Sequence, residues 1–245
     1  MSEEVLIARR GEILDITLNA PERGNAASDA MAIRLGDILE AETQARCIIL
    51  RGAGDDFCTG RASGPPPQPL PDAHQLRVMH DIVFRAYGAV RKSPAPVIAL
   101  IQGRALGFGC ALAAVADITI ASQRATFQVP EFAHNIMPTM VMSSMIDRLS
   151  LKAIMYLVYT SKIIGAEQAL SLGLVNEIVA PDQLESAAEA LCASLLKASR
   201  PAVFGVKEYA MQAQGADIAT AVSYARSLHA LVNTSSDLRA NFKKP

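Results

Sequence analysis

The most informative part of the chain runs from Pro96 to Pro138 and reads PVIALIQGRALGFGCALAAVADITIASQRATFQVPEFAHNIMP. Its pattern of apolar and small residues predicts, in order, a buried strand at Val97–Ile101, a turn with Gly103 and Gly107, a helix at about 107–116 and a strand at 118–121. A strand that enters a helix through a glycine-rich turn leaves the first N–H groups of that helix without intrahelical partners. Those donors and the helix dipole favour a negative charge at the turn.

Composition restricts the classes of protein to consider. Of the 245 residues, 51% are hydrophobic and 19% are charged, which is typical of a globular protein with a substantial core. The formal net charge of −1 gives no electrostatic reason to expect a nucleic acid or an anionic membrane as partner. No apolar run approaches the about 18 residues that a membrane span needs. The start, MSEEVLIARRGE, is acidic where a signal peptide is basic, and the four cysteines are scattered, so we expect a cytoplasmic protein with reduced thiols.

The rest of the chain predicts an α/β core followed by helices. The N-terminal part has the pattern strand, strand, helix, strand, at about 5–8, 13–18, 28–45 and 47–50. The segment Gly64–Pro71, GPPPQPLP, is expected to be a stiff surface loop rather than a proline-rich interaction motif. We divide the chain into an α/β core at 1–180 and a helical region at 181–245 that serves packing and oligomerisation.

Several common kinds of site do not fit the motifs. Gly103, Gly107 and Gly109 have the spacing G-x-x-x-G-x-G, which is neither the dinucleotide fingerprint nor the P-loop. The nucleophile motif G-x-S-x-G of serine hydrolases is absent from the sequence. The four histidines have no spacing that would make them converge with carboxylates, so we expect no metal site.

An oxyanion hole fits what remains. Such a hole consists of two backbone N–H groups that point at an oxygen that becomes negative during the reaction. One donor would come from the turn near Phe108. The second would come from Phe57–Ala62, FCTGRA, because this tight loop also follows a predicted buried strand.

Several motifs, taken together, resemble those of the enoyl-CoA hydratase/isomerase family, the crotonase superfamily. The resemblance rests on NAPERGNA at 19–26, FCTGRAS at 57–63, the stretch at 96–121, ATFQVPE at 125–131 and GAEQALSLGLVNEIV at 165–179. It implies a spiral of repeated ββα units followed by a helical trimerisation region. It also implies trimers or pairs of trimers and acyl-CoA thioester substrates. Coenzyme A then belongs to the substrate, and no separate cofactor is implied.

The resemblance also implies roles for individual residues. The oxyanion donors become the backbone N–H groups of Arg61 and Phe108. The loop expected to contact CoA contains Arg23, Gly24 and Ala26. The remaining residues expected to line the substrate are Thr59, Gly60, Gly107, Ala111 and His134.

The carboxylates depart from the pattern of the family's hydratases. Those enzymes typically use two glutamates, because adding water needs both a base and an acid. This chain keeps Glu131 but has Ala111 at the position of the other glutamate. A single base suits double-bond isomerisation or related enolate chemistry, so Glu131 is predicted to be a proton shuttle whose pKa is raised by burial. Three alternatives stay open. They are a hydratase whose water is activated by other groups, a CoA-thioester hydrolase or lyase, and a non-catalytic acyl-CoA-binding homologue.

Three side chains have two interpretations each at this point. The ring of Phe108 either reshapes the acyl pocket or packs into the core. The guanidinium of Arg61, where the family often has alanine, faces either the CoA phosphates or solvent. His134, three residues after Glu131, is either a second acid–base group or turned away from the site.

Overall fold

The computed structural model describes residues 3–62, 64 and 68–241, and within them the strands form two sheets. The larger sheet has the order β1-β2-β3-β4-β6-β9, formed by Val5–Arg10, Ile13–Leu18, Cys47–Gly52, Val97–Ile101, Ile118–Ser122 and Glu177–Val179. Only the pair β1–β2 in it is antiparallel. The smaller sheet has the order β5-β7-β8, formed by Arg104–Leu106, Thr126–Gln128 and Ile164–Gly165. These alternating strands and helices confirm the predicted α/β spiral.

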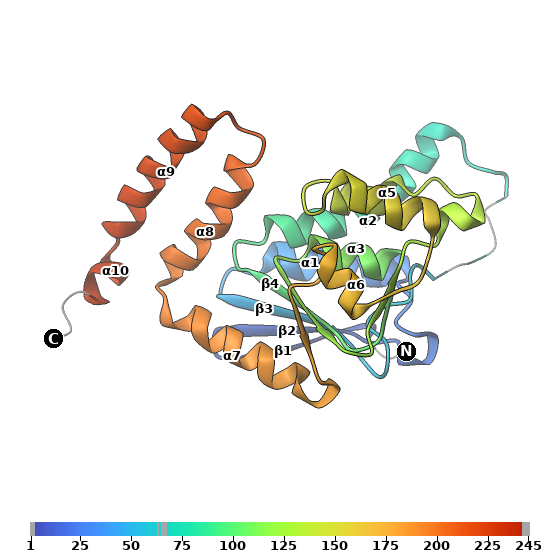
Figure 1. The fold of residues 1–245 in the computed structure, drawn as a ribbon, viewed down its shortest axis with the longest axis horizontal. Helices are drawn as coiled ribbons and strands as arrows, with labels where there is room; N and C mark the ends of the chain where they lie inside the picture. Colours follow the sequence, from blue (N-terminus) through green and yellow to red (C-terminus); the bar gives the residue numbers. More distant parts are fainter. Residues whose placement is uncertain (1–2, 63, 65–67, 242–245) are drawn as a thin grey trace.

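Helices cover both faces of the larger sheet (Figure 1). One face packs against α1, α2 and α3, which comprise Asp29–Ala41, Ala73–Lys92 and Phe108–Val115. The other face packs against α7, Leu184–Lys197. Along β3, Ile48 and Leu50 face the first group, whereas Cys47 and Ile49 face α7. Burial on both faces explains why β3 and β4 are continuous apolar runs without alternation.

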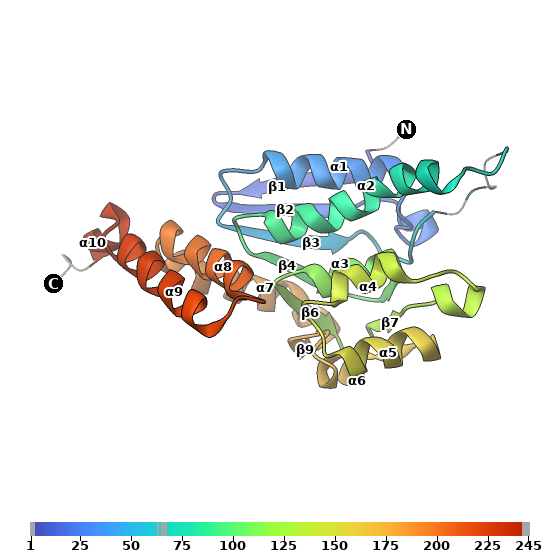
Figure 2. The same ribbon diagram turned by 90° about the horizontal axis from the view of Figure 1, so that it is seen from above.

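Side-chain caps fix where the first two long helices begin. The hydroxyl of Ser28 accepts a hydrogen bond from the N–H of Met31 at 3.0 Å, so α1 begins where the sequence predicts. At the start of α2, the side chains of Asp72 and Gln75 bond each other's backbone N–H at 2.8 and 2.9 Å. The two helices lie side by side on one face of the larger sheet (Figure 2).

The prediction of a plain turn between Gly103 and Gly107 is wrong, because residues 104–106 form the short strand β5. Three residues are too few to show an alternating pattern. The strand pairs in parallel with β7, and Ala105 also forms an isolated bridge with Cys58. β5 thereby brings the loop after β3 next to the start of α3.

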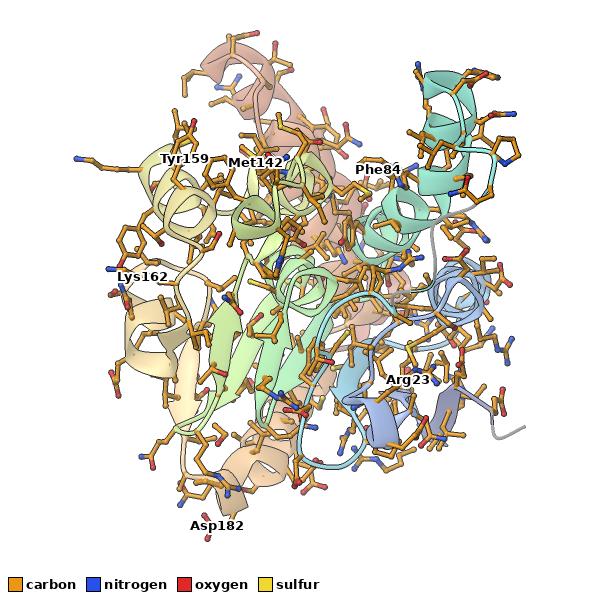
Figure 3. All side chains as sticks on the ribbon, turned by 90° about the vertical axis from the view of Figure 1, so that its right-hand side faces the viewer. Arg23, Phe84, Met142, Tyr159, Lys162 and Asp182 are labelled. Carbon is orange, nitrogen blue, oxygen red and sulfur yellow. The ribbon has the colours of Figure 1, made fainter. Side chains whose placement is uncertain are left out.

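In the part of the chain that the structure describes, six shorter helices lie in the loops between these elements, and one of them, α4, packs against α3. They comprise η1, η2, α4, α5, α6 and η3, at Pro21–Arg23, Glu131–His134, Thr139–Met145, Leu151–Thr160, Ala166–Ser171 and Pro181–Gln183. Figure 3 views one end of the molecule, where the labelled Phe84, Met142 and Tyr159 lie on α2, α4 and α5. Of the proline-rich segment, residues 65–67 lie outside the described residues, and Gln68 and Leu70 are exposed as expected of a surface loop.

The last helices extend away from the sheets (Figures 1 and 2). They are α8, α9 and α10, at Arg200–Ala213, Ile218–Asn233 and Ser236–Asn241. α8 is tied to the core by Lys207, whose Nζ lies 2.6 Å from an oxygen of Asp117. α7 packs on the sheet, whereas α8 to α10 project from it. The division of the chain at residue 180 stays a prediction. Among the described residues, no helix combines the length and apolar character needed to cross a membrane.

Candidate active site

Two loops form the candidate site, and they are in direct contact. The N–H of Leu106 donates to the carbonyl oxygen of Cys58 at 2.9 Å. At Gly109, in the first turn of α3, a Cβ atom would lie 2.1 Å from that same oxygen, closer than any real contact. Glycine at 109 therefore lets the loop that contains Arg61 approach the start of α3.

The two predicted oxyanion donors lie on these adjoining loops. Gly107 has φ 49° and ψ −111°, which is accessible to glycine but not to other residues, and this turn starts α3 at Phe108. Both neighbours of Arg61 bond to Ala27, through the Gly60 carbonyl at 2.8 Å and the Ala62 N–H at 2.9 Å. Within the described residues, no hydrogen bond engages the backbone N–H of Arg61 or of Phe108. Both donors are thus available to a ligand oxygen.

Glu131 lies against the same turn. It is the first residue of η2, and its Oε1 lies 2.8 Å from where a Cβ at Gly107 would be. That Cβ position is also 3.8 Å from the Cα of Gly60, so the structure brings the three residues together. The Oε2 atom of Glu131 is buried and has no hydrogen-bond partner among the described residues. This oxygen can accept a hydrogen bond or a proton from a ligand.

Burial is the main cause of an altered protonation equilibrium at Glu131. It raises the pKa of the carboxyl group above its ordinary value of 4.5, because the charged form loses hydration. The dipole of its own backbone and the neighbouring imidazole of His134 lower the pKa but do not cancel the effect of burial. His134 itself ends η2 with an exposed side chain, and no hydrogen bond joins it to Glu131 within the described residues.

The ring of Phe108 packs into the core. It is 2% exposed and stacks on Tyr87 of α2, with ring centroids 5.4 Å apart. Burial raises the pKa of Tyr87, and the negative charge of Glu131 raises it further. Tyr87 is not among the predicted site residues, because no sequence motif connects it with Phe108. The one signal for it in the sequence is a phenol group among the apolar residues of the segment that forms α2.

The guanidinium of Arg61 lies between Asp29 and the ring of Phe108, and 31% of the side chain is exposed. Its Nη2 pairs with Asp29 at the start of α1, and its Cζ lies 6.0 Å from the centroid of the Phe108 ring. Phe108 therefore has Tyr87 and the guanidinium as neighbours. A cation near an aromatic ring is attracted by the ring's quadrupole.

The loop predicted to contact CoA is bonded to the loop that contains Arg61. The N–H and the hydroxyl of Thr59 both donate to the carbonyl oxygen of Gly24, at 2.9 and 3.1 Å. The guanidinium of Arg23 donates to the carbonyl oxygen of Ala26 at 2.9 Å and pairs with Glu4. The structure thus brings four of the predicted substrate-lining residues together, while their contact with CoA stays a prediction.

Ala111 and the two thiols near α3 do not supply a second base. Ala111 is buried, and its N–H donates to the carbonyl oxygen of Gly107 at 2.9 Å, within the first turn of the helix. Burial raises the pKa of Cys58 to about 11 and that of Cys110 to about 12, so both thiols stay protonated at neutral pH. The described part of the chain contains no cluster of side chains suited to bind a metal ion.

Known proteins share both this fold and this sequence pattern. A crystal structure of an enoyl-CoA hydratase from Mycobacterium smegmatis matches 97% of the chain and 93% of its own length with a TM-score of 0.91 at 26% identity. A protein of Thermobifida fusca YX, solved in complex with CoA, matches 93% of the chain and 92% of its own length with a TM-score of 0.84 at 25% identity. The fold is therefore that of the crotonase superfamily.

Sequence comparison narrows this class to one family. The profile of the enoyl-CoA hydratase/isomerase family matches residues 8–241, so the chain belongs to this family. A short-chain-enoyl-CoA hydratase of Clostridium acetobutylicum is 30% identical over 227 residues, which cover 90% of this chain and 85% of the relative. A 1,2-epoxyphenylacetyl-CoA isomerase of Escherichia coli K12 is 30% identical over 252 residues, which cover 98% of this chain and 94% of the relative. Relatives of similar identity thus include both hydratases and isomerases.

Proposed function

We propose that the protein binds an acyl-CoA thioester and moves a double bond along its acyl chain, or performs related enolate chemistry, with Glu131 as the one general base. The observation that carries this proposal is the carboxylate of Glu131, whose Oε1 lies against the turn that ends at Phe108 and whose buried Oε2 has no hydrogen-bond partner among the described residues. The CoA complex of the Thermobifida fusca protein supports the ligand class.

The proposed reaction is a proton transfer from one carbon to another. Glu131 removes a proton from the α-carbon of a 3-enoyl thioester, and the electron pair moves into the carbonyl to form a dienolate. The N–H groups of Arg61 and Phe108 donate to the negative oxygen, which preorganised donors stabilise strongly. Glu131 then returns the proton to the γ-carbon, giving the 2-enoyl thioester. No atom is lost or gained.

Hydration is the second candidate, and the Clostridium relative favours it. Water addition needs one group to activate water and another to protonate the α-carbon. Ala111 offers no such group, and the protonated thiols of Cys58 and Cys110 are weak acids. Hydration would therefore require Glu131 to perform both transfers in turn.

Incubation with a panel of thioesters in D2O tests the proposal. The panel contains straight-chain 2- and 3-enoyl, branched, cyclic and aromatic CoA esters, and mass spectrometry identifies the products. An isomerase converts a 3-enoyl ester without change in mass apart from incorporated deuterium, whereas a hydratase adds the mass of water. Binding of the panel without exchange or conversion would support a non-catalytic homologue and contradict the proposal.

The rate of α-proton exchange is expected to fall as the pH is lowered through the raised pKa of Glu131, because only the ionised carboxylate is a base. The midpoint of this acid limb should lie above pH 4.5, the ordinary value for glutamate. A pH–rate profile of saturated butyryl-CoA exchange measures it. A midpoint at or below that value would mean that Glu131 is hydrated or is not the base.

We also propose that the protein is a homotrimer or a pair of trimers. Apolar side chains on α8 and α9 support assembly, since Val206, Ile218 and Leu231 are 73%, 81% and 70% exposed. Light scattering should give three or six times the 26.1 kDa chain mass, and Leu231→Glu should shift the distribution toward smaller species. Leu70→Glu is the matched control, because Leu70 is 71% exposed but lies outside the C-terminal helices. A monomeric wild-type protein would contradict the proposal.

A further inference from the structure

Buried polar atoms without partners concentrate at the candidate site. Among the described residues, six buried side-chain nitrogen or oxygen atoms lack a hydrogen-bond partner. Three of them belong to the site, namely Oε2 of Glu131 and both Nε and Nη1 of Arg61. Leaving such an atom unpaired is costly, and more so when it belongs to a charged group. Oε2 is explained by the proposed proton transfer, but the two nitrogens of Arg61 are not.

The surroundings of Arg61 satisfy only one edge of its guanidinium. Nη2 pairs with Asp29, whose side chain is 69% exposed and therefore hydrated. The ring of Phe108 lies near Cζ and offers no hydrogen-bond acceptor. Nε and Nη1 are thus buried N–H donors of a permanent cation, and the group that matches them best is an anionic oxygen.

We infer that Arg61 selects acyl-CoA thioesters whose acyl chain carries a carboxylate. The inference rests on the proposed function, because the same residue is proposed to bind the thioester oxygen through its backbone N–H. The guanidinium then lies one arginine side chain away from the thioester carbonyl. The phosphates of CoA are separated from that carbonyl by the whole pantetheine arm, so a carboxylate on a short acyl chain is the better match.

Matched pairs of thioesters test this inference. Glutaryl-CoA and pentanoyl-CoA differ by a carboxylate in place of a methyl group, as do succinyl-CoA and butyryl-CoA. Isothermal titration calorimetry of the wild-type protein should show binding of each carboxylated ester at least about tenfold tighter than its partner, as expected for one charge-assisted hydrogen bond. Equal affinities, or tighter binding of the thioesters that end in a methyl group, would overturn the inference.

Arg61→Met is the decisive variant. Methionine keeps the backbone N–H and an aliphatic chain over Phe108 but removes the cation. It should abolish the preference for carboxylated esters, whereas the control Arg85→Met should preserve it. Arg85 is suited to this control, because Asp37 and Glu40 already engage its guanidinium at 2.6 and 3.0 Å. If Arg61→Met weakens both members of each pair equally, the side chain serves the CoA portion or the hole, and the inference is wrong.

A separate readout distinguishes this inference from the proposed function. Deuterium exchange at the α-carbon of butyryl-CoA reports on Glu131 and the backbone donors. Exchange without any preference for carboxylated esters would refute the inference alone. A preference that Arg61→Met abolishes, in a protein that exchanges no proton, would refute the catalytic proposal alone.

Discussion

Glu131→Gln is expected to lower the rate of α-proton exchange by about 10²–10⁴-fold, the usual contribution of a positioned general base. Glutamine has nearly the same shape as glutamate and fills the same space beside Gly107, but its amide is not a base at neutral pH. The backbone N–H groups of Arg61 and Phe108 are unaffected by the substitution. The affinity for saturated thioesters should therefore change little, so the loss should appear in kcat rather than in binding.

The same variant should be at least as stable as the wild-type protein at neutral pH. Because burial raises the pKa of Glu131, the folded protein favours the protonated carboxyl. The stabilising contribution of that proton is complete below about pH 4.5 and is lost as the pH rises through the raised pKa. The uncharged amide avoids this loss, so thermal unfolding at pH 7 should not shift downward.

Glu167→Gln on α6 is the control, since Glu167 is exposed in the first turn of that helix. This variant should exchange α-protons at the wild-type rate. If Glu131→Gln also retains that rate, the single-base mechanism is wrong. If Glu131→Gln loses both activity and stability, the carboxylate has a structural role that the raised pKa does not indicate.

The long elements and the site loops could be predicted from the sequence, because each signal is local. Val97–Ile101 has the predicted bounds, and Ser28 caps α1 as expected. The strands β5, β7 and β8 were not predicted, because two or three residues cannot show a period. They are nevertheless the elements that bring the two site loops together.

Contacts between side chains far apart in the sequence could not be predicted. Asp29 is the partner of Arg61, and Tyr87 is the partner of Phe108, yet no spacing rule connects these pairs. The structure resolves the alternatives for Phe108 in favour of core packing, and it directs the guanidinium of Arg61 toward Asp29. The family resemblance predicts backbone donors because they depend on loop position, whereas side-chain partners depend on tertiary packing.

Gly109→Ala is expected to have the second large effect, on both stability and catalysis. The added Cβ would lie 2.1 Å from the carbonyl oxygen and 2.8 Å from the Cβ of Cys58. The first of these is a backbone atom, so the two loops must separate rather than a side chain rotate. We expect a loss of about 2–3 kcal/mol in the free energy of unfolding, at the upper end for overpacking a core. The melting temperature should fall by about 5–10 °C.

Gly88→Ala is the matched control. It makes the same substitution at another helical glycine, and the free energy of unfolding is expected to change in the opposite direction. Gly88 lies within α2, and a Cβ there meets no other atom within 4 Å. Alanine should therefore stabilise the protein by about 0.5–1 kcal/mol through its better helix propensity. Differential scanning calorimetry measures both shifts under one set of conditions.

The catalytic consequence of Gly109→Ala follows from the geometry of the hole. Arg61 N–H and Phe108 N–H can donate to one oxygen only if their loops stay in contact, and the Cys58–Gly109 approach maintains that contact. α-Proton exchange should fall by about 10²-fold or more even at temperatures where the variant is fully folded, the cost of losing one oxyanion donor. If a folded Gly109→Ala variant exchanges protons at the wild-type rate, the two N–H groups do not act on one oxygen. Glu131 would then act without an oxyanion hole formed by these loops.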